Sequence, residues 1–105
     1  MNEITPKELK ARLDRRDPVV LQDVRQDWAT KLCRLENAVH IPIEEIESRT
    51  EELNPEDEIV VYCHVGQRRA AVAEYLTQLG LKNAKTLLGG LDYWAQTVDP
   101  AMRTY

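Results

Sequence analysis

The feature that most constrains the fold is a continuous apolar run, EIVVY, at residues 58–62. A half-exposed strand alternates apolar and polar residues, whereas a strand covered on both faces shows no such alternation. The run therefore predicts a central strand of a parallel sheet. It leads directly into Cys63, and a glycine and two arginines follow within six positions.

Helices and strands are predicted to alternate on both sides of this run. Thr5, Pro6 and Glu8 have the pattern of a helix start with a capping box. Further helices are expected over 26–35, 67–79 and 91–98, strands over 19–24, 38–43 and 84–88, and a solvated helix or two turns over the acidic stretch 44–53. This order predicts an α/β domain in which a mostly parallel central sheet is flanked by helices, with the ligand site at the carboxyl ends of the strands.

Length and charge limit the function classes. A chain of 105 residues suits one domain, residues 1–105, with a single modest core. The net charge is -4 and the charges are mixed, so no basic stripe offers a surface for nucleic acid. The polar start lacks a signal-peptide core, and no stretch approaches the roughly 20 apolar residues that span a bilayer. We expect a cytoplasmic protein that binds neither nucleic acid nor a membrane.

The two cysteines, Cys33 and Cys63, stand far apart and form no CxxC pair, and His40 and His64 complete no zinc-ligand spacing. We therefore expect free thiols and no structural metal. Cys33 is expected to be a small buried residue. The alternative is a resolving thiol that forms a disulfide with Cys63.

Residues 63–68 are expected to form a tight loop between the end of a strand and the start of a helix. Successive backbone N–H groups in such loops bind anions, and the helix adds its partial positive charge; both stabilise a cysteine thiolate. Gly66 lets the loop curl, and Arg68 and Arg69 offer guanidinium groups to an anionic substrate. An isolated cysteine after a strand is more often an interior residue, but these neighbours favour a nucleophile at Cys63.

Four segments, in order, resemble the rhodanese family, the single-domain sulfurtransferases. The resembling segments are LQDVR at 21–25, NAVHIPI at 37–43, VVYCHVGQRRAAVAEYLTQLG at 60–80 and LLGGLDYW at 87–94. The third contains the family's Cys-x-x-Gly-x-Arg active loop. The resemblance runs from about Leu9 to Val98, which is nearly the whole chain.

The resemblance implies a thiosulfate sulfurtransferase that needs no metal or cofactor. The Cys63 thiolate would attack the outer sulfur of a donor such as thiosulfate, release sulfite and become a persulfide. A thiophilic acceptor, which is cyanide, a thiol or a protein, would then remove that sulfur. The terminal sulfur would be stabilised by the backbone N–H groups of the loop residues His64, Val65, Gly66, Gln67 and Arg68.

Four other residues receive supporting roles. Arg68 matches the family's loop arginine and is assigned to organising the loop and attracting the anionic donor. Arg69 departs from the small residue common there, and it either strengthens the attraction or points to solvent. Asp23 is expected to accept hydrogen bonds from neighbouring loops. Arg25 is expected to be an ion-pair partner rather than a substrate ligand.

Two other functions remain open. Cys63 to Arg69 also fits the Cys-x5-Arg loop of cysteine-dependent phosphatases, although the Gly66-x-Arg68 register and the lack of a histidine before the cysteine favour sulfur transfer. The second alternative is a regulatory or persulfide-relay module that takes sulfur from one protein and hands it to another without small-molecule turnover. The acidic stretch 44–53 could then be a docking face.

Overall fold

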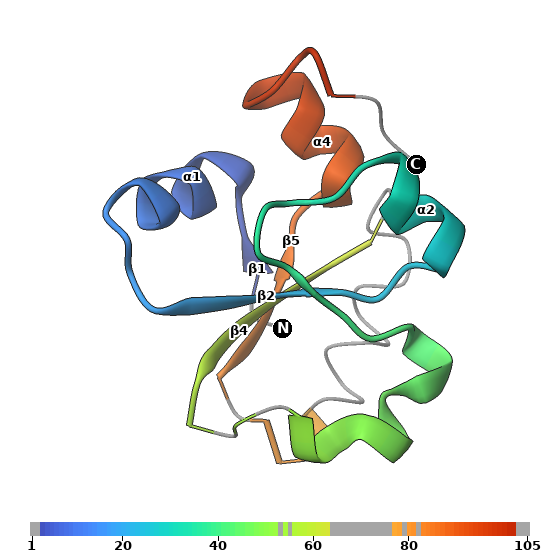
Figure 1. The fold of residues 1–105 in the computed structure, drawn as a ribbon. Coiled ribbons are helices and arrows are strands. Elements are labelled where there is room, and N and C mark those ends of the chain that lie inside the picture. The colour runs from blue at the N-terminus through green and yellow to red at the C-terminus, as the bar shows by residue number, and fades with distance from the viewer. Residues whose placement is uncertain are drawn as a thin grey trace.

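The structure is a computed structural model that describes residues 3–52, 54, 56–63, 77–78, 80–81 and 83–102. Helices and strands alternate as predicted up to residue 62, and most of the helix predicted over 67–79 lies outside the described residues (Figure 1). The strands are β1 (Glu3–Ile4), β2 (Val19–Asp23), β3 (Val39–His40), β4 (Glu58–Tyr62) and β5 (Ala84–Leu87). The helices include α1 (Pro6–Asp14), α2 (Asp27–Leu32), α4 (Gly90–Thr97) and two 3-10 helices, η1 (Ile43–Glu45) and η2 (Glu47–Glu52).

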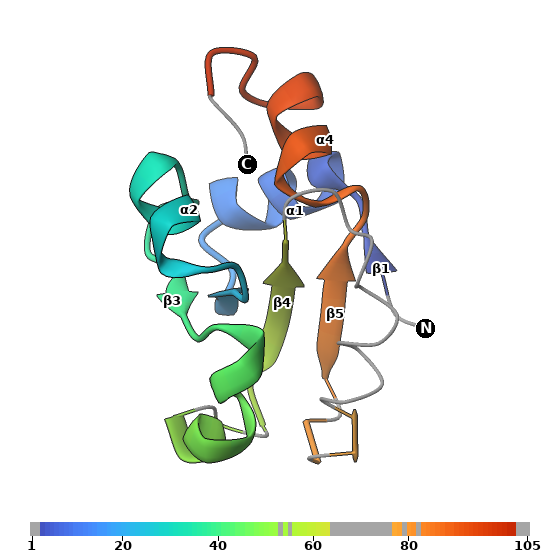
Figure 2. The same cartoon turned by 90° about the vertical axis from the view of Figure 1, so that its right-hand side faces the viewer.

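The described strands form one sheet in the order β1-β5-β4-β2-β3, and every pair in it is parallel. β4 lies in the middle, paired with β2 on one side and β5 on the other. The central strand predicted at 58–62 is therefore confirmed with the same bounds. Because the pairs are parallel, the carboxyl ends of the strands meet at one edge of the sheet (Figure 2).

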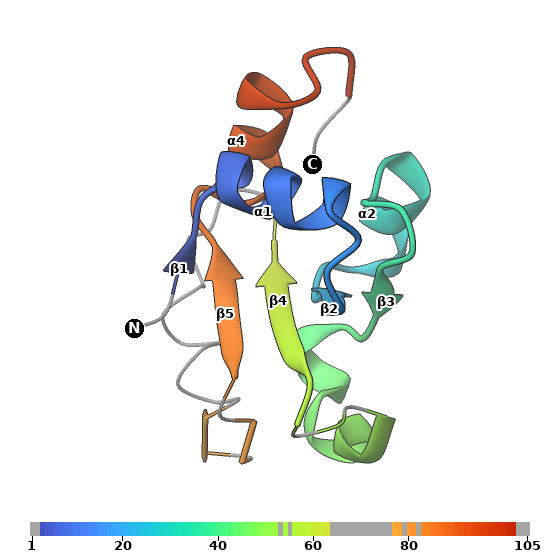
Figure 3. The same ribbon diagram turned by 90° about the vertical axis from the view of Figure 1, so that its left-hand side faces the viewer.

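The sheet has a hydrophobic core on each face, which makes the α/β arrangement three layers deep. Successive side chains of a strand point to opposite faces, so Ile59 and Val61 belong to one core and Val60 and Tyr62 to the other. α1 and α4 cover the second core (Figure 3), and the segment around Ile46, between η1 and η2, covers the first. This explains why β4 is apolar at four successive positions.

The first helix begins with the predicted capping box. The Thr5 hydroxyl accepts a hydrogen bond from the Glu8 N–H at 3.1 Å, and the Glu8 carboxylate accepts one from the Thr5 N–H at 3.2 Å. Pro6 occupies the first position of α1, where its missing N–H costs no helical hydrogen bond. Leu9 then points inward and is fully buried.

An ion-pair network joins α1 to the amino-terminal ends of two strands. Arg12 binds both carboxylate oxygens of Glu58, at 2.6 and 2.8 Å, and its Nε lies 2.6 Å from Asp17. The Lys85 Nζ donates to the same Glu58 carboxylate at 2.9 Å. These contacts hold the pKa of Glu58 at about 2, chiefly through the hydrogen bonds from Arg12.

The short edge strand β1 was not predicted from the sequence. It contains only Glu3 and Ile4, which pair with Thr86 and Leu87 of β5. Two residues are too few to show a periodic pattern, and the flanking residues are polar. Ile4 is buried because its pairing with β5 places it in the core that also contains Leu9 and Leu91.

The second helix is shorter than the predicted 26–35 and presents a different face. α2 ends at Leu32, and its buried residue is Ala29. Trp28 and Leu32, which the helical spacing places together, are 52% and 46% exposed. Leu35 does reach the core, but from the segment that follows the helix. The large apolar residues of 26–35 are thus divided between the surface and the interior.

Candidate active site

Cys63 is the residue that follows the central strand β4, at the edge of the sheet where the carboxyl ends of the strands meet. It is partly buried and packs against the core that contains Ile59 and Val61. In open α/β sheets, this edge is the usual location of ligand sites. The fold therefore presents the thiol where such sheets carry out chemistry.

The start of α4 is attached to the backbone of Cys63. The Leu91 N–H donates a hydrogen bond to the Cys63 carbonyl oxygen at 2.7 Å. Leu91 is in the first turn of α4, where backbone N–H groups have no partner within the helix. The contact thus satisfies an otherwise unpaired donor and fixes the backbone at the site.

The Gly89-Gly90 turn allows this contact. Both glycines have positive φ angles, 74° and 65°, in a region that residues with side chains rarely adopt. A Cβ atom added to Gly89 would lie 2.5 Å from the Cβ of Tyr93. Gly89 is therefore needed both for its backbone angle and for the close approach of Tyr93.

A buried ion pair lies at the end of the neighbouring strand β2. Asp23 accepts hydrogen bonds from the Arg25 backbone N–H at 2.9 Å and from the Arg25 guanidinium at 2.7 to 3.2 Å. Burial disfavours the charge of Arg25, but Asp23 outweighs it and raises the Arg25 pKa above its ordinary value. The pair is almost completely shielded from solvent, with Arg25 7% exposed.

Arg25 also connects this pair to three other segments. Its guanidinium donates to the Cys33 carbonyl at 2.5 Å, and its own carbonyl accepts from the His40 Nε2 at 2.7 Å. The guanidinium carbon lies 5.6 Å from the centre of the Tyr62 ring. Arg25 thus ties β2 to the end of α2, to β3 and to β4.

Tyr62 completes this cluster on the face of the sheet opposite Cys63. Its hydroxyl accepts a hydrogen bond from the Leu35 N–H at 3.1 Å. Burial raises the pKa of Tyr62, and the negative charge of Asp23 raises it further. Arg25 is thus the ion-pair partner of Asp23 at the strand ends on which the site is built, and the supporting role of both residues at the site stays a prediction.

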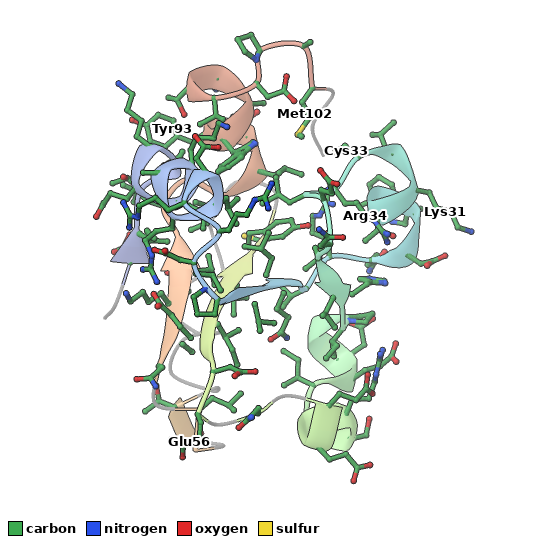
Figure 4. All side chains as sticks on the ribbon, turned by 60° about the vertical axis from the view of Figure 1, so that its left-hand side comes forward. Lys31, Cys33, Arg34, Glu56, Tyr93 and Met102 are labelled. Atoms are coloured by element: carbon green, nitrogen blue, oxygen red, sulfur yellow. The ribbon has the colours of Figure 1, made fainter. Side chains whose placement is uncertain are left out.

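The two thiols lie against different cores. Cys63 packs on the Val61 face of the sheet, whereas Cys33 packs on the opposite face, the one that carries α1, α4 and Met102 (Figure 4). Cys33 is a thiol whose Sγ lies 3.6 Å from the Arg25 Nη1. With the central sheet between them, a direct bond to Cys63 would require a rearrangement of the backbone.

The predicted loop lies outside the described residues. This applies to His64, Val65, Gly66, Gln67, Arg68 and Arg69. Their roles in binding the persulfide and attracting the donor stay predictions.

Sequence reasoning missed two polar residues in the sheet. Gln22 is 0% exposed and Thr86 is 1% exposed, and the polar side-chain atoms of both have no hydrogen-bond partner among the described residues. A single glutamine or threonine in a strand is ordinarily attributed to a solvent-facing position, so the sequence carries no signal that marks them. Both face the core against which Cys63 packs, because they are in register with Val61.

A cavity of about 630 Å³ lies on the other face of the sheet, between α1, α4 and residues 34–36. Leu13, Trp94 and Met102 form part of its apolar wall. Its described lining contains no cysteine, serine, threonine, histidine or tyrosine. The role of Cys63 as the nucleophile stays a prediction.

Within the described ranges, no three His, Cys, Asp or Glu side chains are grouped so that they could hold a metal ion. Nor does any helix in the same ranges have the length and apolar character needed to cross a bilayer.

Fold and site together define a class: a three-layer α/β protein that presents a cysteine at the carboxyl end of its central parallel strand. Residues 5–97 match the model of the rhodanese-like domain. The chain belongs to the rhodanese-like domain family. The fold also matches a crystal structure of a rhodanese-like domain protein from Staphylococcus aureus, with a TM-score of 0.86, 32% identity, and coverage of 100% of this chain and 99% of that one.

Three curated relatives are similar in sequence. A thiosulfate sulfurtransferase, GlpE, from Coxiella burnetii is 29% identical over 72% of this chain and 71% of its own length. A putative sulfur carrier protein, YrkF, from Bacillus subtilis is 32% identical over 88% of this chain. The adenylyltransferase and sulfurtransferase MOCS3 from Arabidopsis thaliana is 31% identical over 97%. This chain spans 50% of the YrkF length and 25% of the MOCS3 length.

Proposed function

We propose that the protein is a sulfurtransferase in which Cys63 takes a sulfane sulfur atom from a donor and passes it to an acceptor. The observation that carries the proposal is the position of Cys63, directly after the central strand of a sheet that belongs to the rhodanese-like family. A role in sulfur transfer in general is supported by relatives named sulfurtransferase or sulfur carrier.

With thiosulfate as the donor, the Cys63 thiolate attacks the outer sulfur atom. A new S–S bond forms as the bond between the two sulfur atoms of thiosulfate breaks, and sulfite leaves with the electron pair. Cys63 then carries a persulfide with one negative charge. A thiolate acceptor attacks the terminal sulfur, becomes a persulfide itself and releases the Cys63 thiolate. Neither step needs a metal or a redox cofactor.

The surroundings of Cys63 favour such exchange. Its carbonyl is fixed by Leu91, so the residue cannot swing away from the end of the strand when a donor approaches. The following residues, 64–68, are proposed to direct their backbone N–H groups toward the terminal sulfur, as an oxyanion hole does toward developing charge. Arg68 and Arg69 are proposed to attract the anionic donor.

The test is the intact mass of the reduced protein after incubation with thiosulfate. We expect the parent and a Cys33→Ser variant each to gain one sulfur atom, and a Cys63→Ser variant to gain none. Equal sulfur uptake by the Cys63→Ser variant would place the chemistry elsewhere. No uptake by the parent from thiosulfate or from an inorganic polysulfide would reject sulfur transfer.

A second candidate is a persulfide relay between proteins. It is supported by the finding that this chain matches only part of MOCS3 and of the sulfur carrier YrkF. A relay predicts that a protein persulfide loads Cys63 faster than thiosulfate does at equal concentration. The rate of mass gain with each donor separates the relay from small-molecule turnover.

The phosphatase alternative predicts a different product. Hydrolysis of an aryl phosphate at a rate abolished by Cys63→Ser would favour it, and none of the three relatives named above is a phosphatase.

A further inference from the structure

Gln22 and Thr86 are buried polar side chains whose hydrogen-bonding groups are not satisfied by the described residues. Within the part of the chain that the structure describes, both polar atoms of the Gln22 amide and the Thr86 hydroxyl are without hydrogen-bond partners, although the two residues are 0% and 1% exposed. The great majority of buried polar side-chain atoms are hydrogen-bonded, because leaving them unpaired is costly. Two such residues in one small sheet therefore indicate a function.

The strand register places the two residues on either side of Val61. Gln22 of β2 is level with Val61 of β4, and Val61 is level with Thr86 of β5. Residues level with one another in adjacent strands point to the same face of the sheet. Gln22 and Thr86 therefore flank Val61 on one face.

Cys63 lies one step further along that face. It is two residues beyond Val61 and packs against the same core as Val61 does. A residue two positions beyond the paired one is a diagonal neighbour, at about 7–8 Å between Cα atoms, which is within reach of a long side chain. Cys63 is therefore a diagonal neighbour of both Gln22 and Thr86 on that face. The Gln22 side chain is long, and a persulfide extends the reach of Cys63 toward Thr86 by one S–S bond, about 2 Å.

We propose that Gln22 and Thr86 bind the sulfur carried on Cys63, the amide N–H and the hydroxyl each donating a hydrogen bond to the anionic persulfide. This inference rests on the proposed function and adds two substrate-binding residues to it. The amide has two donors and the hydroxyl one, and sulfur in a persulfide anion accepts hydrogen bonds. These donors gain a partner only when Cys63 carries the extra sulfur atom. They therefore stabilise the persulfide relative to the thiolate and slow the transfer of that sulfur to an acceptor.

The experiment compares the lifetime of the persulfide in matched variants. The protein is loaded with thiosulfate, the donor is removed, and loss of the added sulfur to a fixed concentration of a small thiol is followed by intact mass. Gln22→Met and Thr86→Val keep the size of the side chains and remove the donors. We expect each to shorten the lifetime about tenfold, the effect of one hydrogen bond to a charged group. Thr86→Ser keeps the hydroxyl and is expected to keep the parent lifetime.

Thermal unfolding distinguishes binding from a structural role. Because an apolar side chain replaces an unpaired polar one, Gln22→Met and Thr86→Val are expected to be at least as stable as the parent. Gln96→Met makes the same exchange on the exposed side of α4, where the Gln96 amide donates to Asp92. It is the control and is expected to leave the persulfide lifetime unchanged.

The outcomes separate this inference from the function on which it rests. Parent and variants that load equally and lose sulfur at the same rate would overturn the binding role and leave sulfur transfer intact. A parent that takes up no sulfur from thiosulfate or polysulfide would instead reject the proposed function. If the variants with shortened persulfide lifetimes also unfolded at a clearly lower temperature than the parent, the binding role would be overturned as well, because a disturbed fold would account for the faster loss of sulfur.

Discussion

The Leu91 N–H donates to the Cys63 carbonyl oxygen across 2.7 Å, which joins the start of α4 to the residue that follows the central strand. The contact satisfies a donor in the first turn of the helix and an acceptor beyond the end of the strand. It is reached through the Gly89-Gly90 turn. Two segments that are distant in the sequence are therefore coupled at the site.

Gly89→Ala is expected to weaken this coupling. Alanine would carry the strain of a φ near 74°, and its Cβ would overlap Tyr93 at 2.5 Å. We expect a loss of about 3 kcal/mol in the free energy of unfolding, the sum of backbone strain and overpacking, together with slower sulfur uptake. Urea denaturation and the mass assay measure the two effects.

Gly80→Ala is the matched control for that substitution. Gly80 has a φ of 90°, but an added Cβ would have no atom of the described residues within 4 Å. Only the backbone strain of about 1 kcal/mol should appear, and sulfur uptake should not change. Equal losses in the two variants would contradict the role given to Tyr93 and the α4 contact.

Arg25→Met is expected to destabilise the protein strongly. It leaves the fully buried Asp23 carboxylate without its cation and removes the donor to the Cys33 carbonyl. Breaking a buried ion pair by removing one partner costs about 3–5 kcal/mol. Chemical denaturation of this variant should therefore show a large fall in the midpoint, and the double variant Asp23→Asn/Arg25→Met should recover part of it.

Arg49→Met supplies the comparison on the surface. Arg49 binds Glu45 and Glu52, but these are exposed ion pairs on the 3-10 segment. Its loss should change the denaturation midpoint only slightly. If Arg25→Met lowered the denaturation midpoint no more than Arg49→Met does, the buried ion pair would not support the strand ends.

The Glu58 carboxylate makes stability depend on pH. Its pKa in the folded protein is about 2, below the ordinary 4.5, chiefly because of Arg12. A group with a lowered pKa adds stability above its unfolded pKa, and the contribution fades as the pH falls through the folded pKa. Glu58→Gln should therefore be less stable than the parent at pH 7, by no more than about 1 kcal/mol because the pair is partly open to solvent.

The difference between parent and Glu58→Gln should shrink between about pH 5 and pH 2. Denaturation midpoints measured across that range test this. Glu44→Gln is the control, since within the described ranges Glu44 has no ion pair. A difference that stayed constant down to pH 2 would show that Glu58 stabilises the fold by packing rather than by charge.

The sequence pattern predicts correctly those elements that are determined by interactions between residues close together in the chain. The capping box of Thr5 and Glu8 and the buried run at 58–62 are confirmed because each depends on neighbours within a few positions. The position of Cys63 at the strand end follows from that run. The helix predicted over 91–98 is confirmed as α4, in which Leu91 and Trp94 are buried, whereas Tyr93 lies against Gly89 and is 40% exposed.

Other features depend on contacts between residues that are distant in the sequence, which a local sequence pattern does not reveal. β1 exists only because Ile4 lies beside Leu87, and Trp28 is at the surface because α2 packs through Ala29. Gln22 and Thr86 are the clearest case. A polar residue in a strand suggests an exposed face, and only the pairing of β2, β4 and β5 shows that both residues face the core against which Cys63 packs.

The pairing of β4 on both sides has a consequence for motion. Its amides should exchange with deuterium only when the sheet as a whole opens, whereas β1 and β3, with two residues each, can open separately at the edges. Cys63 is attached to the slowest-exchanging strand and to α4. Fraying at the margins of the sheet should therefore leave the thiol in place, so that the chain can tolerate local unfolding without losing the position of its reactive atom.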